Sequence, residues 1–191
     1  NAIDEPTQLT MYQDLLKDCF QTMKLFGSKV AFLPLGGSGK DWKQEGCAAY
    51  LQMVSRLRTA GEMAKQEGIT IGIRTGMGAK FDKKLLKKVG SSQIKVYYNF
   101  QDAADHHRDI CKELRKLGAQ RIVQIHASNT DSVNLQEDPE INLPKIRKTL
   151  DKMKWSGWLV VERSRDVKRV RDVKYNFGRN IAYLKQVFQE R

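Results

Sequence analysis

Apolar residues recur along the chain in two alternating patterns, one spaced like a helix face and one gathered in short continuous runs. The helical spacing is clear near the start, where Leu9, Leu16, Met23 and Phe26 fall on one stripe and Gly27 marks its end. This spacing predicts helices over residues 8–26, 47–66, 82–89, 105–117, 144–153 and 170–189. The short apolar runs predict strands over residues 29–35, 69–75, 94–100, 121–127 and 158–161.

The order of these elements predicts the fold class. One helix comes first and five strand–helix pairs follow, which is typical of α/β proteins with parallel strands and right-handed crossovers. A closed barrel of eight such pairs needs about 250 residues, and this chain has 191. We expect a single domain over residues 1–191 that is either an incomplete (β/α) barrel or an open sheet whose edge another subunit covers. A five-stranded flavodoxin-like sheet is the structural alternative.

The last predicted strand leads to the main candidate residue. Trp158–Val161 is a continuous apolar run, which predicts a strand buried on both faces, and Glu162 follows it directly. A carboxylate in such a place is costly unless it is paired, bound to a metal or used. Ligands of α/β proteins bind at the carboxyl ends of the strands. The three preceding strands also end in polar residues, namely Arg74, Asn99 and His126.

Loops and helix starts add weaker signals. The glycine-rich loop 36–39 follows a strand but fits no phosphate-binding pattern, so we interpret it as a flexible turn. Asp82 and Asp105 are the expected N-caps of the helices that follow them.

Composition narrows the choice of partners and compartment. The formal net charge of +12 suits either an anionic partner or solubilising lysines, and the even spread of basic residues favours the second. Three scattered cysteines argue against a disulfide framework and a zinc site. The longest apolar runs fall short of the ~20 residues of a membrane span, and no signal peptide is visible. We expect a soluble protein, cytoplasmic or, if a targeting segment was removed, periplasmic.

Four segments carry a resemblance to a known family. They read Ile-Thr-Ile-Gly-Ile-Arg-Thr at 69–75, Ile-Lys-Val-Tyr-Tyr-Asn-Phe at 94–100, Arg-Ile-Val-Gln-Ile-His-Ala at 121–127 and Gly-Trp-Leu-Val-Val-Glu-Arg-Ser at 157–164. This succession resembles the last four strands of the xylose isomerase-like TIM barrels, the sugar phosphate isomerase/epimerase family. The resemblance runs from about residue 29 to the C-terminus. It implies strands four to eight of the barrel together with the helix before them.

The resemblance implies a metal site and its chemistry. Members of the family typically hold manganese, magnesium, cobalt or zinc through Glu, Asp, His and Glu at the strand ends. The two glutamates move protons at the carbons beside the sugar carbonyl. By position, His126 and Glu162 correspond to the last two ligands, whereas Arg74 and Asn99 replace the first two. Because arginine stays protonated, the alternatives are a weakened metal site or a metal-free site in which Arg74 pairs bidentately with Glu162.

Three functions remain open from the sequence. The first is an isomerase or related lyase that acts on a small sugar or sugar phosphate, with Glu162 as base and Arg74 and His126 beside it. The second is a carbohydrate-binding barrel that has lost its chemistry. The third is an apurinic endonuclease-like enzyme with nucleic acid as partner, which the basic charge would suit. It is ranked last, because such enzymes need a multi-metal cluster and this chain has three histidines, with Arg74 in the way.

Several polar residues after the strand ends are candidates for substrate contacts. Their alternative roles are helix caps, plain loop positions and, for the two arginines, phosphate binding or ion pairs with Asp166 and Asp172. With Asn99, this group comprises Asp102, His106, Asn129, Arg163 and Arg165.

Overall fold

The structure, a computed structural model, describes residues 6–35 and 44–190. The predicted loop 36–39 lies outside the described residues. Along the chain the helices and strands are α1 (Pro6–Leu25), β1 (Val30–Pro34), α2 (Ala48–Gln66), β2 (Thr70–Arg74), α3 (Ala79–Val89), β3 (Ile94–Asn99), α4 (Phe100–Ala104), α5 (Ile110–Leu117), β4 (Ile122–His126), α6 (Leu143–Lys152), β5 (Trp158–Val160) and α7 (Val173–Phe188). Two short 3-10 turns, η2 (Ala119–Arg121) and η3 (Val167–Arg169), stand before β4 and α7.

The sheet follows the order predicted from the sequence. Its strands lie in the order β1-β2-β3-β4-β5, so each strand neighbours the next one in the chain. The pairs β3–β4 and β4–β5 are parallel, as strand–helix alternation requires. Their register places Asn99 opposite His126, and His126 opposite Val160. The carboxyl ends of these strands therefore meet at one edge of the sheet.

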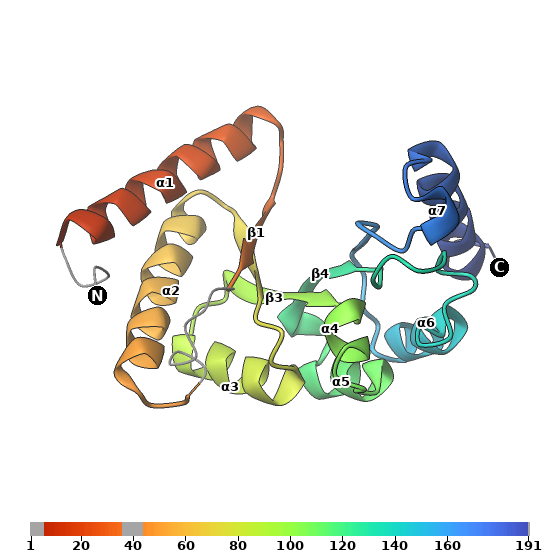
Figure 1. Ribbon diagram of the computed structural model, residues 1–191. Helices are drawn as coiled ribbons and strands as arrows, with labels where there is room; N and C mark the ends of the chain where they lie inside the picture. Colours follow the sequence, from red (N-terminus) through yellow and green to blue (C-terminus); the bar gives the residue numbers. More distant parts are fainter. Residues whose placement is uncertain (1–5, 36–43, 191) are drawn as a thin grey trace. The chain divides into compact units, whose positions relative to one another are not determined.

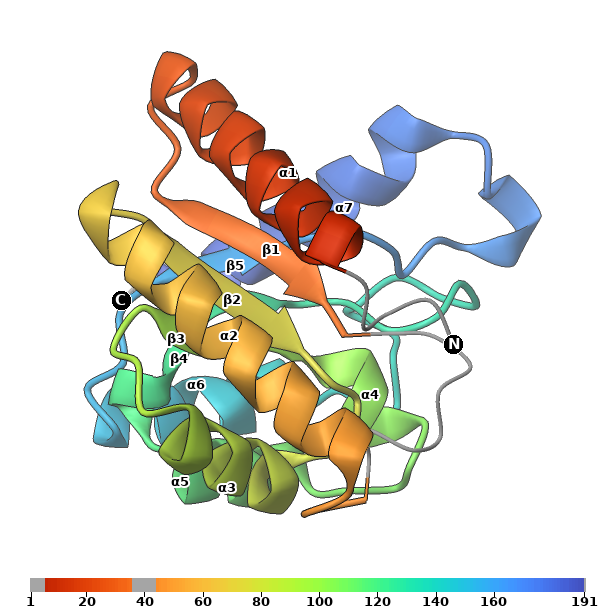
Figure 2. The ribbon, with the colours of Figure 1, turned by 90° about the vertical axis from the view of Figure 1, so that its left-hand side faces the viewer.

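The chain divides into two compact units, and each is described by itself. The first consists of residues 1–73 and 84–95. Helices α1 and α2 lie side by side in it, next to β1 and β2 (Figure 1, Figure 2). Helical spacing turns apolar side chains inward, and fully buried members of its core include Phe20, Leu57, Ile69 and Ile71. Arg58 donates hydrogen bonds to the backbone carbonyls of Lys88 and Val89 at the end of α3.

The second unit consists of residues 74–83 and 96–191 and contains the strand ends discussed below. Helix α6 packs against both α5 and α7 in this unit (Figure 1). Its core is formed by apolar residues of β4, α5 and α6, among them Leu114, Leu117, Ile125, Leu143 and Ile146. No helix among the described residues is long and apolar enough to span a membrane.

Two predicted helix starts were wrong. Helix α3 begins at Ala79, and Asp82 lies within its first turn, where it accepts a hydrogen bond from the Thr75 hydroxyl instead of capping the helix. The helix predicted over residues 105–117 begins later, as α5 with Asp109 as its N-cap, and the short helix α4, capped by Asn99, precedes the predicted range. Asp105 stands at the C-terminal end of α4. Periodicity could not choose among these aspartates, since Asp is common both at caps and within first turns.

Strand β5 is also less buried than predicted. Trp158 is 73% exposed, and Leu159 and Val160 are half-buried. The strand is the last in the sheet order and pairs only with β4 among the described residues, so one of its edges faces no strand. The apolar run correctly predicted a strand but not its surroundings.

Candidate active site

The core of the candidate site is a buried histidine at the end of β4. His126 is 6% exposed, and the side-chain amide nitrogen of Asn99 lies 3.5 Å from its Nδ1. The Tyr97 ring packs on its imidazole, with 4.4 Å between ring centroids. Asn99 is fixed in turn because its Oδ1 accepts a hydrogen bond of 2.8 Å from the backbone of Gln101, at the start of α4. The strand register thus delivers three polar or aromatic side chains to one place.

Glu162 completes a pair with this histidine. Its Oε2 lies 3.5 Å from His126 Nδ1, and its side chain is 50% exposed. Burial lowers the pKa of His126, Glu162 and Asp102 oppose that shift, and Arg74 adds to it. The imidazole is therefore neutral at neutral pH. A protonated Nδ1 would donate a hydrogen bond to Glu162, whereas an unprotonated Nδ1 would accept one from Asn99. The tautomer of His126 therefore decides which of these two residues its Nδ1 bonds.

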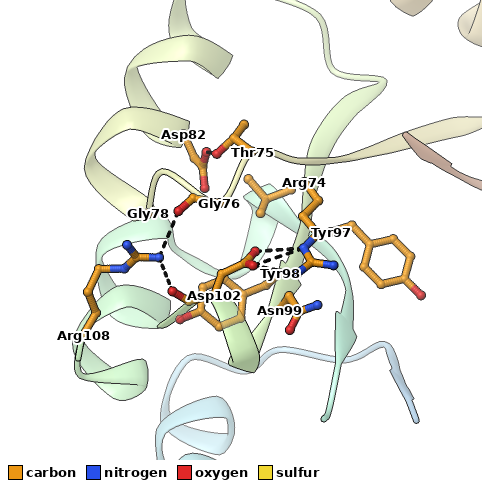
Figure 3. Close-up of a pocket in the computed structure, with 11 residues that line it drawn as sticks. Arg74, Thr75, Gly76, Gly78, Asp82, Tyr97, Tyr98, Asn99, Asp102 and Arg108 are labelled. Atoms are coloured by element: carbon orange, nitrogen blue, oxygen red, sulfur yellow. Dashed lines mark hydrogen bonds and ion pairs between the residues drawn. The ribbon is translucent and has the colours of Figure 1, made fainter. Parts of the chain in front are cut away.

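Arg74 pairs with a carboxylate other than the predicted one. Its Nε lies 3.0 Å from Asp102 Oδ2 and its Nη2 lies 2.7 Å from Asp102 Oδ1, a two-pronged ion pair (Figure 3). The hydrogen bond with Asp102 raises the pKa of Arg74, and Glu162 adds to the rise through its charge. Arg74 therefore pairs with Asp102 and not with the predicted Glu162. The charge of Glu162 still acts on Arg74 electrostatically.

A second arginine ties the loops around this pair together. Arg108 Nη2 donates to the carbonyl oxygens of Asp102, at 2.6 Å, and Gly76, at 3.2 Å (Figure 3). The nearby Glu113 carboxylate accepts from the backbone of Ala79, at 2.7 Å. Gly78 has a φ of +85°, which strains residues with a side chain, and a Cβ there would come within 2.9 Å of Glu113 Oε2, so that carboxylate would have to shift. These contacts fix the loop that carries Arg74 into α3.

Asp82 is a buried acid behind Arg74 and Asp102. Its side chain is 5% exposed, and burial raises its pKa from the ordinary 3.8 to about 7. The negative charges of Glu113 and Asp102 add to the rise, whereas Thr75 and Arg108 oppose it. A cavity of about 10 Å³ adjoins it, large enough for one water, and the buried Tyr98 hydroxyl lines it (Figure 3).

The remaining predicted contact residues form hydrogen bonds with other groups. His106 is exposed, with its Nδ1 2.9 Å from the Asp102 carbonyl oxygen. Asn129 is buried, and its amide nitrogen donates to Asp138 and Glu140, both at 3.1 Å. These bonds give Asn129 a role in the loop after β4.

The two arginines after Glu162 share one partner. Arg165 forms a two-pronged pair with Asp131, and Arg163 Nη2 lies 3.5 Å from the same carboxylate. The pairs considered from the sequence do not form, since Asp166 and Asp172 cap η3 and α7. Two positive charges facing one negative charge leave an excess of positive charge at this loop.

Sequence analysis missed several residues of the site. Tyr97 shares a strand face with Asn99 two positions later, and that alternation is a signal that could have found it. Asp131 lies in a loop whose path no periodicity predicts. Buried asparagines on α7 and in the loop after β4 were also missed, as described below.

The donor set does not fit a divalent cation. The positions that the sequence resemblance assigns to the family's four ligands hold Arg74, Asn99, His126 and Glu162, that is, one amide, one imidazole, one carboxylate and one fixed positive charge. Hard divalent ions prefer several oxygen ligands, and a guanidinium nearby repels them. Within residues 6–35 and 44–190 no three His, Cys, Asp or Glu side chains are grouped as a metal site would require.

The family of the chain follows from a sequence comparison. The family model for xylose isomerase-like TIM barrels matches residues 3–187. The chain belongs to this family. No curated protein matches it in sequence.

Solved structures show the same fold at low identity. A D-psicose 3-epimerase from Clostridium cellulolyticum H10, solved with D-tagatose, matches at a TM-score of 0.74 and 13% identity, over 96% of this chain and 73% of that one. A sugar phosphate isomerase/epimerase from Parabacteroides distasonis ATCC 8503 matches at a TM-score of 0.74 and 15% identity, over 95% of this chain and 67% of that one. An AP endonuclease, family 2, from Brucella melitensis matches at a TM-score of 0.73 and 14% identity, over 91% of this chain and 69% of that one. The predicted α/β class and partial TIM barrel are confirmed, while identities this low show the fold alone.

Proposed function

We propose that this chain is an isomerase-type enzyme that removes a proton next to the carbonyl group of a small sugar or sugar phosphate. The observation that carries the proposal is the half-exposed Glu162 carboxylate, 3.5 Å from a buried, neutral His126 at the strand ends. Membership of the xylose isomerase-like family supports the choice of chemistry. Solved structures of the same fold, named as sugar epimerases and isomerases, support the substrate class.

Glu162 is the proposed base. One of its oxygens takes the proton from the hydroxyl-bearing carbon beside the carbonyl. The C–H electron pair becomes the C=C bond of an enediolate, and the carbonyl π electrons move to the carbonyl oxygen. When Glu162 returns the proton to the former carbonyl carbon, the product is the isomer. The step needs no oxidant or reductant.

Arg74 is the proposed stabiliser of the enediolate oxygen. Its bonds to Asp102 use Nε and Nη2, so the Nη1 edge of the guanidinium is not part of that pair. A guanidinium held in place by a carboxylate is preorganised to donate to a developing negative charge. Asp102 thus acts through Arg74 as a positioning residue, which replaces the substrate contact predicted for it.

His126 is the proposed shuttle for the hydroxyl proton. Isomerisation also moves a proton between the two enediolate oxygens, and a neutral imidazole can accept it on one side and return it on the other. Its burial, which lowers the pKa, keeps it in that neutral form. Epimerisation with two bases is disfavoured, because an amide and a guanidinium occupy the positions of the missing carboxylates.

Deuterium wash-in tests the proposal without knowledge of the product. The protein is incubated in D₂O with a panel of pentuloses, hexuloses and their phosphates, and NMR follows the C–H signals beside the carbonyl. We expect exchange with at least one sugar, and Glu162→Gln to slow it by about 10²–10⁴-fold. Glu137→Gln is the matched control, since Glu137 is an exposed glutamate paired with Arg179.

Two results would count against the proposal. Exchange that persists in Glu162→Gln would exclude this residue as base. A sugar that binds without any exchange would favour a carbohydrate-binding barrel, the second hypothesis. The substitution of two family ligands by Arg74 and Asn99 is the specific observation that favours this alternative.

A further inference from the structure

The backbone that follows Glu162 is unusually constrained. Ser164 has a positive φ of 72°, which L-residues other than glycine seldom adopt, and it is fully buried. It lies two residues after Glu162 and one before Arg165, so its conformation sets the direction of both side chains. Backbone strain of this kind persists only where the surroundings hold it.

Two asparagines and one backbone amide hold Ser164. Its carbonyl oxygen accepts from Asn180 Nδ2, at 2.8 Å, and from Asn134 Nδ2, at 3.2 Å. Its hydroxyl oxygen accepts from the backbone nitrogen of Asn129, at 2.7 Å. Asn180 also lies 3.5 Å from the carbonyl oxygen of Arg163, one residue after Glu162. Both the backbone and the side chain of this single residue are therefore engaged.

A third asparagine holds the next turn of the same segment. Asn176 Oδ1 accepts from the backbone nitrogen of Asp166, at 2.8 Å, and from Asn134 Nδ2, at 3.0 Å. Its Nδ2 donates to the carbonyl oxygens of Arg169 and Asp172, at 2.7 and 2.9 Å. Asn180 Oδ1 accepts from the backbone of Leu135, at 2.8 Å. The three asparagines thus bridge α7, the loop after β4 and the segment after β5.

All three asparagines of the network are buried. Asn176 and Asn180 are fully buried, Asn134 is 1% exposed, and the two on α7 are four residues apart on one helix face. Buried amides are costly unless they form hydrogen bonds, and the side-chain nitrogen of each of these asparagines donates to the segments that it joins. An apolar helix face would pack with less cost but would not fix a backbone path.

We propose that Asn134, Asn176 and Asn180 form a clamp that fixes residues 162–166 and positions the Glu162 carboxylate beside His126. The clamp rests on the proposed function for its purpose, since it positions the proposed base. The asparagines touch no reacting atom and act through the backbone of Arg163, Ser164 and Asp166.

The test uses a double-mutant cycle between the clamp and the carboxylate. The imidazole resonances of His126 are followed by NMR at fixed pH in Glu162→Gln, Asn180→Ala and the double variant. We expect Glu162→Gln to move them, Asn180→Ala to move them in the same direction, and the double variant to move them no further. Asn180→Asp, which keeps the acceptor for Leu135 but loses the donor to Ser164, is the second variant if Asn180→Ala folds poorly.

Trypsin gives a second readout that does not involve Glu162. Arg163 and Arg165 are cleavage sites within the clamped segment, and we expect Asn180→Ala to be cut there at least about tenfold faster than the wild type. Leu184→Ala is the matched control, since Leu184 is a buried residue of the same helix that takes no part in the clamp. Comparison at equal folded fraction removes the effect of overall stability.

The outcomes separate the clamp from the proposed function. Unchanged His126 resonances in Asn180→Ala, with a clear shift in Glu162→Gln, would overturn the clamp. Equal cleavage in Asn180→Ala and Leu184→Ala would overturn it as well. Faster cleavage in Asn180→Ala would uphold the clamp even if Glu162→Gln left His126 unmoved, and that second result would count against the Glu162–His126 pair of the proposed function.

Discussion

The two sides of the strand-end site differ in how exposed their charged side chains are and in what those side chains contact. The side near β2 and β3, here called the Arg74 corner, comprises Arg74, Thr75, Asp82, Asp102 and Arg108. The side near β4 and β5, here called the Glu162 edge, comprises His126, Asp131, Glu162, Arg163 and Arg165. In the corner the charges of Arg74 and Asp102 lie against each other, and little of either side chain is exposed, 26% for Arg74 and 19% for Asp102. At the edge the Glu162 carboxylate is half exposed beside a neutral imidazole.

This difference separates two tasks. Partnered charges in the corner satisfy one another and hold a geometry, so their loss should act first on stability. A half-exposed carboxylate next to a neutral base can exchange a proton with a ligand, so its loss should act first on chemistry. Substitutions that neutralise single groups on either side can break or sharpen this distinction.

The largest stability effect is expected at Asp82, the buried acid of the corner. Its pKa is raised to about 7 in the folded protein, above the ordinary 3.8, so the folded state binds a proton that the unfolded state releases between these values. The free energy of unfolding is therefore greatest below pH ~4 and falls as pH rises through about 7. Asp82→Asn removes this dependence and should stabilise the protein at pH 8 by roughly 2–4 kcal/mol, an upper bound from about 1.4 kcal/mol per pKa unit.

Urea unfolding at pH 4 to 8 measures this effect. The variant should match the wild type near pH 4 and exceed it at pH 8. Asp109→Asn is the control. The backbone amide of Lys112 lowers the pKa of Asp109, so this variant should leave the fall in unfolding free energy between pH 5 and 7 in place. The Asp82→Asn variant shows how the other titrating groups change the stability with pH. A difference in unfolding free energy between wild type and Asp82→Asn that does not change from pH 4 to 8, or that changes in favour of the wild type, would contradict the prediction.

A smaller effect is expected from the ion pair of the corner. Asp102→Asn leaves Arg74 partly buried with a neutral partner, and we expect a loss of about 2–3 kcal/mol, below the ~3–5 kcal/mol of a fully buried pair. The pKa of His126 should fall as well, since the charge of Asp102 raises it. Urea unfolding and NMR titration of the imidazole measure the two results.

The matched change at the edge is Asp131→Asn. It removes the common partner of Arg163 and Arg165, yet we expect a smaller loss of stability, because Arg165 is 32% exposed and water can solvate it. Equal losses in Asp102→Asn and Asp131→Asn would show that the two sides do not differ as described.

The sequence predicted the elements better than their partners. A short run of apolar and aromatic residues placed β3 at 94–100, against the observed Ile94–Asn99, because such runs are typical of buried strands. Strand ends then identified Asn99, His126 and Glu162 as neighbours, since parallel strands in register bring their carboxyl ends together. The structure places these residues together as expected.

The partner of Arg74 could not be predicted from the same pattern. Helix α4 has five residues, too few for periodicity to indicate, so the sequence predicts Asp102 as a substrate contact and Glu162 as the partner of Arg74. Once Asn99 caps α4, the next turn presents Asp102 to Arg74. The asparagine clamp was not predicted for another reason, since asparagines are mostly exposed and two of them four residues apart on a helix indicate a solvated face.

The smallest effect is expected from divalent metal ions. A site with a Kd of 10 µM would stabilise the protein by about 2.7 kcal/mol at 1 mM metal, which corresponds to a rise in Tm of several degrees. Because Arg74 holds a fixed positive charge where the sequence resemblance implies a ligand glutamate, we expect 1 mM manganese or cobalt to change Tm by less than about 1 °C. The double variant Arg74→Glu, Asn99→Asp carries the donor set that the resemblance implies, so its Tm should rise with metal, and adding Glu162→Gln should abolish that rise. A clear rise in the Tm of the wild type with metal, lost in Glu162→Gln, would show that the Glu162 edge binds metal even with Arg74 nearby. Metal-dependent chemistry of the family's kind would then be the better hypothesis.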